Sequence, residues 1–585
     1  MAGFGMALAV LLTTLLAAAG MAGLGALALR WRGQRWADLA VGWGVLGLCL
    51  LLTSAVGLPV GPVLVPLLLA GLVAFGWRFR PAGQFWLLAL LVAPLLALAA
   101  AMPVTAWDDF AQWLPNARYL LEQDSFPRAG LPPPASWHGG YPYGVAVVTY
   151  AASLPLRALG LAPMAETAAA VFALLLLATM AAGVVASAGR AASGWAVALA
   201  ALLVFWLNPS FVPRVIFTNY GEAPTAALLG LLALLLLRRD AASGVQAALV
   251  LAAMVNVKQT GLVLAVLVLA GAALLALAER RRPWGLVLLA VPMLVMWALW
   301  QPHAAAAGGV FGFKPLAQWA WGMAEQTLAS IGKIMLQKLF FTLLLLAVLG
   351  LAWLALWRGW RSPAARLALL AAPLLAGWPC FLFIAYMGGD FASYEVVRAA
   401  SFWRYGTQLG GVMMVAAALY LLAQPVPGWL RPWVARRWAL PAGCAVLLLL
   451  PVAGFGLLWP SKREQAPPLR RTLAAVAPSI APGGVVLVVD PGGNGFSAFV
   501  AEYALQGRAR VVLPPRSFER AAPGKATLPA QPTAAQAGQA LMLSADAATL
   551  AAMDTAPLPS GEWRLLRREG AGWVAQAAGR LGVAP

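Results

Sequence analysis

Two adjacent carboxylates are the side chains of this sequence whose type and spacing are best suited to chemistry. Asp108 and Asp109 occur together in a chain that has only 20 acidic residues among 585. A carboxylate within hydrogen-bond reach can take the proton of an attacking hydroxyl, so we expect one of the pair to act as a general base. The other could orient the first, raise its proton affinity by like-charge repulsion, or hold a divalent cation. The residue types leave open which aspartate takes the proton.

The segment around the pair is rich in aromatic residues. Residues 103–144 read PVTAWDDFAQWLPNARYLLEQDSFPRAGLPPPASWHGGYPYG. Aromatic and acidic groups together suit a sugar, and we expect Trp107, His138 and Tyr141 to contact substrate. From about Trp113 to Gln123 the apolar residues have near-helical spacing, which predicts a short helix on a membrane surface. The simpler alternative is that Asp109 caps this helix and Asp108 is solvated.

The rest of the chain has the composition of a membrane protein. Hydrophobic residues make up 62% and charged residues only 10%, whereas soluble domains are ~45–50% apolar. Apolar runs of about 17–25 residues recur up to about residue 459, and each is long enough to cross a hydrocarbon core as a helix. We predict a polytopic α-helical domain, residues 1–460, with about fourteen transmembrane helices. The net charge of +20 is spread between the spans, so the expected partners include membrane lipids but no nucleic acid.

Arginine clusters separate successive pairs of spans and predict the orientation. Because basic loops stay in the cytoplasm, all clusters are expected on that side. The N-terminus, the first large loop at 103–161, the loops at 209–222, 302–337 and 388–406, and the chain after 460 then lie outside. Alanine- and arginine-rich usage is typical of a bacterium, so we expect the inner membrane with a periplasmic C-terminus. The clusters are Arg30, Arg32 and Arg35; Arg78 and Arg80; Arg190; Arg238 and Arg239; Arg280 to Arg282; Arg358, Arg361 and Arg366; and Arg431, Arg436 and Arg437.

The C-terminal segment differs from the spans. Residues 461–585 alternate strand, turn and helix patterns, which predicts a small extracytoplasmic α/β domain of about 120 residues. A glycine-rich turn, Gly492 to Gly495, follows Asp490. A lone turn of this kind is a weak phosphate-binding signal, and we interpret it as structural. Acceptor binding or partner docking is the expected use of the domain.

The order of these features resembles a known family. A span that ends outside is followed by an acidic pair in the first large loop, an aromatic-rich surface helix and a Tyr-Pro segment that leads back to the membrane. Over about residues 85–410 this resembles the GT-C glycosyltransferases, with the protein mannosyltransferase and aminoarabinose transferase branch nearest. The resemblance implies a polyprenyl-phosphate sugar donor and a base or metal-linked carboxylate at Asp108 or Asp109. Three spans precede the motif-bearing one, and the pair is Asp-Asp where relatives often have Asp-Glu, so the sugar stays open.

A lipid phosphate that leaves with developing negative charge needs cations at the outer membrane face. Lys258 lies in VNVKQTGL, a very short predicted turn at that face, and the resemblance implies that a basic residue here meets the phosphate. The alternative is an ordinary snorkelling lysine. Arg404 is the second phosphate candidate, because a guanidinium can bind phosphate oxygens through two hydrogen bonds.

Two further polar clusters are predicted to line the substrate site. NPSFVPRVIFTNYGEAP contains Arg214 and Glu222, and an acid that enters an apolar helix is costly without a role or partner. GGDFASYEVVRAASFWRYG contributes Glu395, Arg398 and Tyr405 beside Arg404. A Glu395–Arg398 pair, three residues apart on a surface helix, is the simpler alternative and would contribute little stability.

No metal site is assigned. His138 and His303 are the only histidines, too far apart for a local zinc motif, although two outer loops could bring them together. A divalent cation at the aspartate pair stays open. The three cysteines lie in apolar spans without metal-ligand or paired spacing, so no disulfide framework is expected.

The sequence thus predicts an inverting glycosyltransferase that moves a sugar from a polyprenyl-phosphate donor to a lipid, glycan or protein acceptor outside the cytoplasm. One carboxylate suffices for inversion, whereas retention needs a nucleophile on the opposite face. A secondary transporter or flippase is the first alternative, and it would show polar or broken helices near the membrane middle. A lipid-linked glycan ligase or polymerase is the second.

Overall fold

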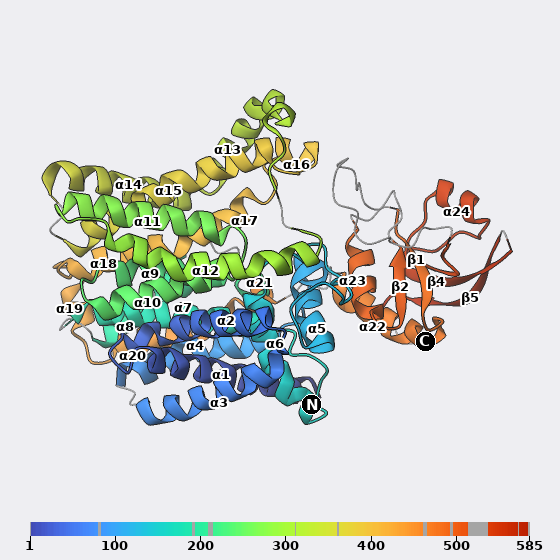
Figure 1. The fold of residues 1–585 in the computed structure, drawn as a ribbon, viewed down its shortest axis with the longest axis horizontal. Helices are drawn as coiled ribbons and strands as arrows, with labels where there is room; N and C mark the ends of the chain where they lie inside the picture. The colour runs from blue at the N-terminus through green and yellow to red at the C-terminus, as the bar shows by residue number, and fades with distance from the viewer. Residues whose placement is uncertain are drawn as a thin grey trace. The chain divides into compact units, whose positions relative to one another are not determined.

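The computed structural model describes residues 2–79, 83–189, 193–208, 215–309, 312–359, 362–459, 465–491, 495–512, 536–570 and 572–582. The chain forms two compact units. Residues 1–102, 116–132 and 140–459 form the first, which we call the helical unit. Residues 103–115, 133–139 and 460–585 form the second, which contains the sheet and which we call the sheet unit (Figure 1).

Ten helical stretches of the described residues are long and apolar enough to cross a membrane, which makes the chain a multi-pass membrane protein. They are α1 (Ala2–Ala28), α2 (Asp38–Ala55), α3 (Val60–Arg78), α4 (Gly83–Ala101), α7 (Ala168–Ser187), α11 (Gly261–Ala278), α12 (Gly285–Ala306), α14 (Leu339–Arg358), α15 (Pro363–Gly388), and the run from α17 (Phe402–Gly406) to α18 (Gly410–Ala423).

The predicted count of about fourteen spans is only partly confirmed. The other four predicted spans coincide with shorter apolar helices: α8 (Gly194–Ala201) with its π-helical continuation η4 (Leu202–Trp206), α9 (Glu222–Leu236), α10 (Ala241–Val255) and α20 (Ala439–Ala453). The helices α9, α10 and α20 have 15 residues each, fewer than the ~20 that usually cross a bilayer. Length alone therefore supports ten spans. The remaining short helices are α13 (Ala324–Gln337), α16 (Ser393–Val397), α19 (Arg431–Val434) and α21 (Phe455–Leu458).

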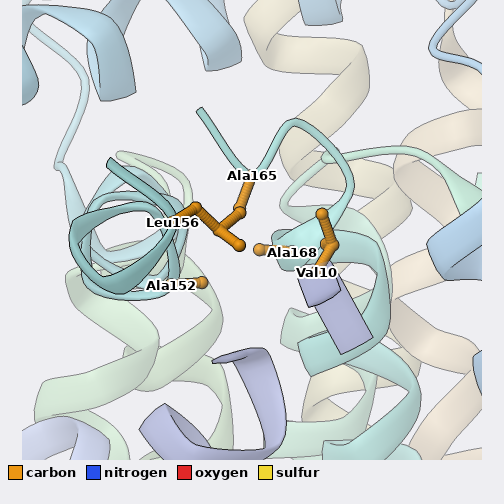
Figure 2. Close-up of a cluster of buried hydrophobic side chains, with 5 residues drawn as sticks. All are labelled: Val10, Ala152, Leu156, Ala165 and Ala168. Atoms are coloured by element: carbon orange, nitrogen blue, oxygen red, sulfur yellow. The ribbon is translucent and has the colours of Figure 1, made fainter. Parts of the chain in front are cut away.

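Two helices occupy the segment assigned to the first large loop. The predicted short helix is present as α5 (Leu114–Gln123), with Pro115 in its first turn. Residues 144–158, which we had assigned to the loop, form α6 (Gly144–Ala158). The apolar side chains of α6 are buried, because they pack against other helices of the unit. Figure 2 shows part of this core, where residues of α6, of the turn before α7 and of the start of α7 lie beside a side chain of α1: Val10, Ala152, Leu156, Ala165 and Ala168.

Glycines let some helices approach at backbone distance. A Cβ atom on Gly23 of α1 would lie 1.7 Å from the carbonyl oxygen of Gly71 on α3. A Cβ atom on Gly411 of α18 would lie 1.8 Å from the carbonyl oxygen of Ala226 on α9. Both contacts exclude any larger residue without separation of the helices, which is a common packing mode in membranes.

Several of the predicted arginine clusters come together in the helical unit. Glu279, directly after α11, accepts hydrogen bonds from Arg239 Nη2 at 3.1 Å and from Arg366 Nε at 2.7 Å. Arg281 Nη2 lies 2.5 Å from its other oxygen. Three clusters that are far apart in sequence therefore share one carboxylate.

Arg78 of the second cluster contacts the loop that carries the first. Arg78 Nε lies 3.6 Å from Asp38 Oδ2, and Arg78 Nη2 donates to the Gly33 carbonyl. The amide of Gln34 donates to Gln246 Oε1 at 2.8 Å, and Gln246 Nε2 donates back to the Gln34 carbonyl. These contacts tie the loop after α1 to α3 and α10, as expected if the arginine loops share one side.

The described residues of the sheet unit form five strands in the order β2-β1-β3-β4-β5, of which Figure 1 labels β1, β2, β4 and β5. Strand β1 pairs in parallel with β2 and β3, and the pairs β3–β4 and β4–β5 are antiparallel. The elements are α22 (Ala466–Val476), β1 (Gly484–Val489), α23 (Phe496–Leu505), β2 (Ala509–Val512), β3 (Gln539–Met542), α24 (Ala547–Met553), β4 (Glu562–Glu569) and β5 (Gly572–Arg580). A small α/β fold is thus present after the spans.

The carboxylate after β1 has a structural partner on each side. Asp490 accepts the hydroxyl of Ser497 at 2.6 Å and that of Ser544 at 2.5 Å. It therefore joins the start of α23 to the end of β3. Residues Gly492 to Asn494 of the glycine-rich turn lie outside the described residues.

Candidate functional site

The helical unit buries an ion pair that the sequence analysis had marked as two separate candidates. Lys258 Nζ donates to Glu222 Oε1 at 3.0 Å, and Arg404 Nε lies 3.4 Å from the same oxygen. Glu222 is 1% exposed and Lys258 4%. Lys258 is thus a buried, paired residue, and the snorkelling alternative does not describe it.

Each of the three charged residues sits at an end of a helix. Glu222 is the first residue of α9, where a negative charge is favoured by the helix dipole. Lys258 occupies the turn between α10 and α11, which is closed by the Gly261 amide on the Lys258 carbonyl at 2.8 Å. The Gly144 amide at the start of α6 donates to Asn256 in that turn, also at 2.8 Å. Arg404 lies in the short helix α17.

Two tyrosine rings complete the cluster. Lys258 Nζ lies 4.7 Å from the ring centroid of Tyr405. The Arg404 guanidinium lies 5.3 Å from the same ring and 5.0 Å from the ring of Tyr220. These distances are within the range of cation–π attraction. We call Tyr220, Glu222, Lys258, Arg404 and Tyr405 the cation cluster.

The cation cluster has more positive than negative charge. Two cations share one carboxylate oxygen of Glu222, which leaves an excess of one positive charge among the three side chains. Glu222 Oε2 is buried and has no hydrogen-bond partner among the described residues. A buried charge is costly unless it is neutralised and hydrogen-bonded. The arrangement can therefore accept an anionic group beside the cations and a hydroxyl donor at Glu222.

The other predicted residues of these segments are placed differently. Glu395 Oε2 accepts the amide of Ala392 at 2.9 Å, so Glu395 caps its own helix α16. Arg398 is exposed at the end of that helix. Arg214 lies outside the described residues. The predicted substrate role of these three residues stays a prediction.

The aspartate pair belongs to the sheet unit. Asp109 opens a π-helical turn, η2 (Asp109–Trp113), and is 1% exposed. Asp108 precedes the turn, is half-buried, and makes no side-chain capping bond to it. The amide of Trp137 donates to the Ala111 carbonyl at 2.8 Å, which joins the two loop segments of the unit.

Aromatic contacts hold these loop segments against α23. The ring of Trp107 lies 4.6 Å from that of Phe499, and the ring of Trp137 lies 5.7 Å from it. Phe110 lies 6.0 Å from Phe496 and 5.5 Å from Tyr503. We call these six residues the aromatic cluster. His138 is half-buried beside it, with its ring 6.3 Å from that of Trp137.

The α23 half of the aromatic cluster was not predicted from the sequence. Phe496, Phe499 and Tyr503 have spacings of three and four residues, which places them on one face of a helix. That spacing indicates an apolar helix face that packs against another part of the chain. It gave no indication that the partner was a loop almost 400 residues away in the chain.

Tyr143, at the end of the loop, and His303 of α12 have partners within the helical unit, and the predicted substrate role of Tyr141 stays a prediction. Tyr143 is buried, its hydroxyl donates to Asn116 Oδ1 at 3.4 Å, and burial raises its pKa well above the ordinary value. His303 Nδ1 lies 2.8 Å from the Pro127 carbonyl, between Phe126 and Trp300. Tyr141 is half-buried at the start of this segment of the helical unit.

Within the part of the chain that the structure describes, no group of three or more His, Cys, Asp or Glu side chains is arranged to hold a metal ion. No protein-family model matches the chain, and no curated protein matches it. Of the predicted site residues, the structure brings together Glu222, Lys258, Arg404 and Tyr405 in one unit, and Trp107, Asp108, Asp109 and His138 in the other.

Proposed function

We propose that this protein is an inverting glycosyltransferase of the GT-C type, which uses a polyprenyl-phosphate sugar as donor. The acceptor is a lipid, a glycan or a protein on the outer side of a bacterial inner membrane. The cation cluster carries the proposal, because it is a buried, positively charged site in a multi-pass membrane protein. Such a site suits the phosphate of a lipid carrier.

The cation cluster is proposed to bind the donor phosphate. As the bond between the anomeric carbon and the phosphate oxygen breaks, the electron pair stays on that oxygen. The charge that develops there is stabilised by Lys258 and Arg404, and Arg404 can provide two parallel hydrogen bonds. Glu222 keeps both cations in place and offers its second oxygen to a sugar or lipid hydroxyl.

The aspartate pair is proposed to provide the base. The acceptor hydroxyl attacks the anomeric carbon, and its proton passes to one carboxylate oxygen of Asp108 or Asp109. A single displacement of this kind inverts the anomeric configuration. The half-buried position of Asp108 and the burial of Asp109 support a division into one accessible base and one supporting carboxylate.

A transporter or flippase is the second candidate, favoured by the burial of Glu222 and Lys258 in a membrane-spanning unit. Ionisable residues at such positions often mark the path of a substrate. The two candidates differ in whether a covalent bond is cleaved.

The test uses purified protein in detergent and radiolabelled polyprenyl-phosphate sugars of several kinds. Asp108→Asn and Asp109→Asn remove the candidate bases, and at least one should lower kcat by about 100-fold or more. Asp554→Asn is the matched control, because this exposed aspartate of the sheet unit has a left-handed backbone that asparagine tolerates. If both variants keep wild-type transfer, the base assignment is wrong. If label crosses sealed vesicles with its sugar bond intact, the protein is a transporter.

A further inference from the structure

The loop that carries the aspartate pair is built into the sheet unit. The chain enters this unit at Pro103 and leaves after Pro115, then returns for residues 133–139. The rest of the unit is the C-terminal segment from residue 460. The aspartates and the C-terminal α/β fold therefore share one folded body.

The residues immediately before and after the aspartate pair along the chain both make contacts within this body. Trp107, immediately before the pair, contacts Phe499, and Phe110, immediately after it, contacts Phe496 and Tyr503. The Arg470 guanidinium of α22 lies 5.8 Å from the Phe110 ring centroid and 6.0 Å from that of Tyr503. Both neighbours of the pair are thus fixed by helices of the C-terminal segment.

The backbone of the pair is helical and closely packed. Asp109 opens a π-helical turn, a wide form of helix that is rare and is frequently found at functional sites. The turn passes directly into α5, and the packing of its side chains adds to the support from that helix. Phe110 is 1% exposed and Trp113 4%, which shows how completely the turn is packed.

We propose that α23 of the C-terminal segment is a positioning element for the carboxylates of Asp108 and Asp109, with Phe499 at its centre. Phe499 contacts both loop segments, since its ring meets Trp107 from the first and Trp137 from the second. The statement that these carboxylates take part in catalysis rests on the proposed function. The structural content of the inference, that Phe499 orders residues 104–113, does not depend on any activity.

Positioning has a large effect in enzymes, because a displacement of about 1 Å of a reacting group can lower the rate about 100-fold. Loss of the Phe499 ring should therefore reduce turnover while donor binding is retained. The cation cluster, which we assign to donor binding, lies in the helical unit, and we expect the substitution to leave it unchanged.

The first experiment measures hydrogen–deuterium exchange of the full-length protein in detergent. Phe499→Leu keeps an apolar side chain of similar volume but removes the ring, and Phe499→Ala removes both. Trp563→Phe is the matched control, because Trp563 is a buried aromatic residue of the same unit that packs on Gly579 of β5. We expect exchange in residues 104–113 to be about tenfold or more faster in both Phe499 variants and unchanged in the control.

Two results would overturn the inference. One is unchanged exchange in residues 104–113 in both Phe499 variants. The other is a similar increase throughout the sheet, β1 included, in both variants, because Phe499 would then serve only the stability of the unit.

The second experiment measures sugar transfer. Phe499→Leu should lower kcat about 100-fold with the donor KM within about twofold of wild type, and Phe499→Tyr should restore most of it. A parallel loss in kcat and donor affinity, or no loss at all, would contradict the positioning role. If wild-type protein transfers no sugar, the proposed function is wrong, and the exchange result still decides whether α23 orders the loop.

Discussion

Glu222 is shared by two cations inside the helical unit. Its contribution to the free energy of unfolding can be measured without an assay of activity. Lys258→Met keeps the length of the side chain but leaves Glu222 opposed by Arg404 alone. Removing one partner of a buried ion pair costs about 3–5 kcal/mol, and the remaining arginine places the expected loss at about 3 kcal/mol. Thermal unfolding in detergent measures the change.

The double variant Glu222→Gln with Lys258→Met provides the internal control. It removes both charges of the pair but also takes from Arg404 the carboxylate that faces it, so we expect it to be less stable than Lys258→Met alone. Lys333→Met, at an exposed lysine of α13, should be close to neutral. A Lys258→Met variant as stable as wild type would show that the pair contributes nothing to folding.

Glu279 predicts a pH dependence of stability. Burial raises the pKa of this carboxyl, but hydrogen bonds and charges from Arg239, Arg366 and Arg281 outweigh burial, and the net pKa is lowered from 4.5. Stabilisation by Glu279 is therefore full above pH 4.5 and is lost as pH falls through the lowered pKa of the folded state. The melting temperatures of wild type and Glu279→Gln should differ by a constant amount at pH 6–8 and converge below about pH 4.5. A difference that grows on acidification would contradict this sign.

At the residue scale the sequence identified members of the site better than their partners. Glu222 stood out because an acid in an apolar segment is costly, and Lys258 because few basic residues lie at the presumed outer face. Their pairing was not predictable, since it depends on how the start of α9 meets the turn before α11. The side-chain distance that joins them is a property of tertiary packing.

At the element scale, the α1–α3 contact predicts a sharp response to a single methyl group. Gly23→Ala would place a Cβ atom 1.7 Å from the Gly71 carbonyl, so α1 and α3 must separate. Overpacking of this kind costs about 1–3 kcal/mol. Gly76→Ala on α3 is the matched control, because no atom lies within 4 Å of the added carbon. Melting temperatures in one detergent should fall for Gly23→Ala only, and equal values would indicate that the helices are free to adjust.

Helices were predictable where apolar runs are long and uninterrupted. The short helix after the aspartate pair was also visible from its spacing, and it is present as α5. The segment that forms α6 was assigned to the loop at 103–161, which follows from the spacing of the arginine clusters, and at 15 residues it is shorter than a typical span. Its helical state is explained by burial against α1 and the start of α7, which no local pattern reveals.

At the scale of the whole molecule, the contacts at Glu279 join three of the arginine loops, and the orientation of the chain stays a prediction. We predict that alkaline phosphatase fused after residue 585 is active, because the C-terminus is expected in the periplasm. A fusion within the loop at Arg238 and Arg239 should be inactive, since that loop is joined to two other arginine clusters through Glu279. The reverse pattern of activity would invert the topology and move the proposed site to the cytoplasmic side.

The division of the chain into two units was the feature of the fold that was hardest to predict from the sequence. A composition change near residue 460 separates spans from tail, and from it we assigned the whole first loop to the membrane domain. The structure instead groups 103–115 and 133–139 with the tail. The reason is the aromatic cluster, whose two halves are separated by more than 300 residues and show no common motif.

The repeated passage of the chain between the two units limits how this protein can be recombined. The chain passes from one unit to the other after residues 102, 115, 132, 139 and 459. The segment from residue 460 onward is therefore not a complete folding unit that can be exchanged by itself. If the segment from residue 460 onward were replaced by that of a related chain, the residue at position 499 would not be matched in shape to Trp107. Viable chimeras should carry both loop segments along with the tail, and across a set of homologues the residues at positions 107 and 499 should change in step.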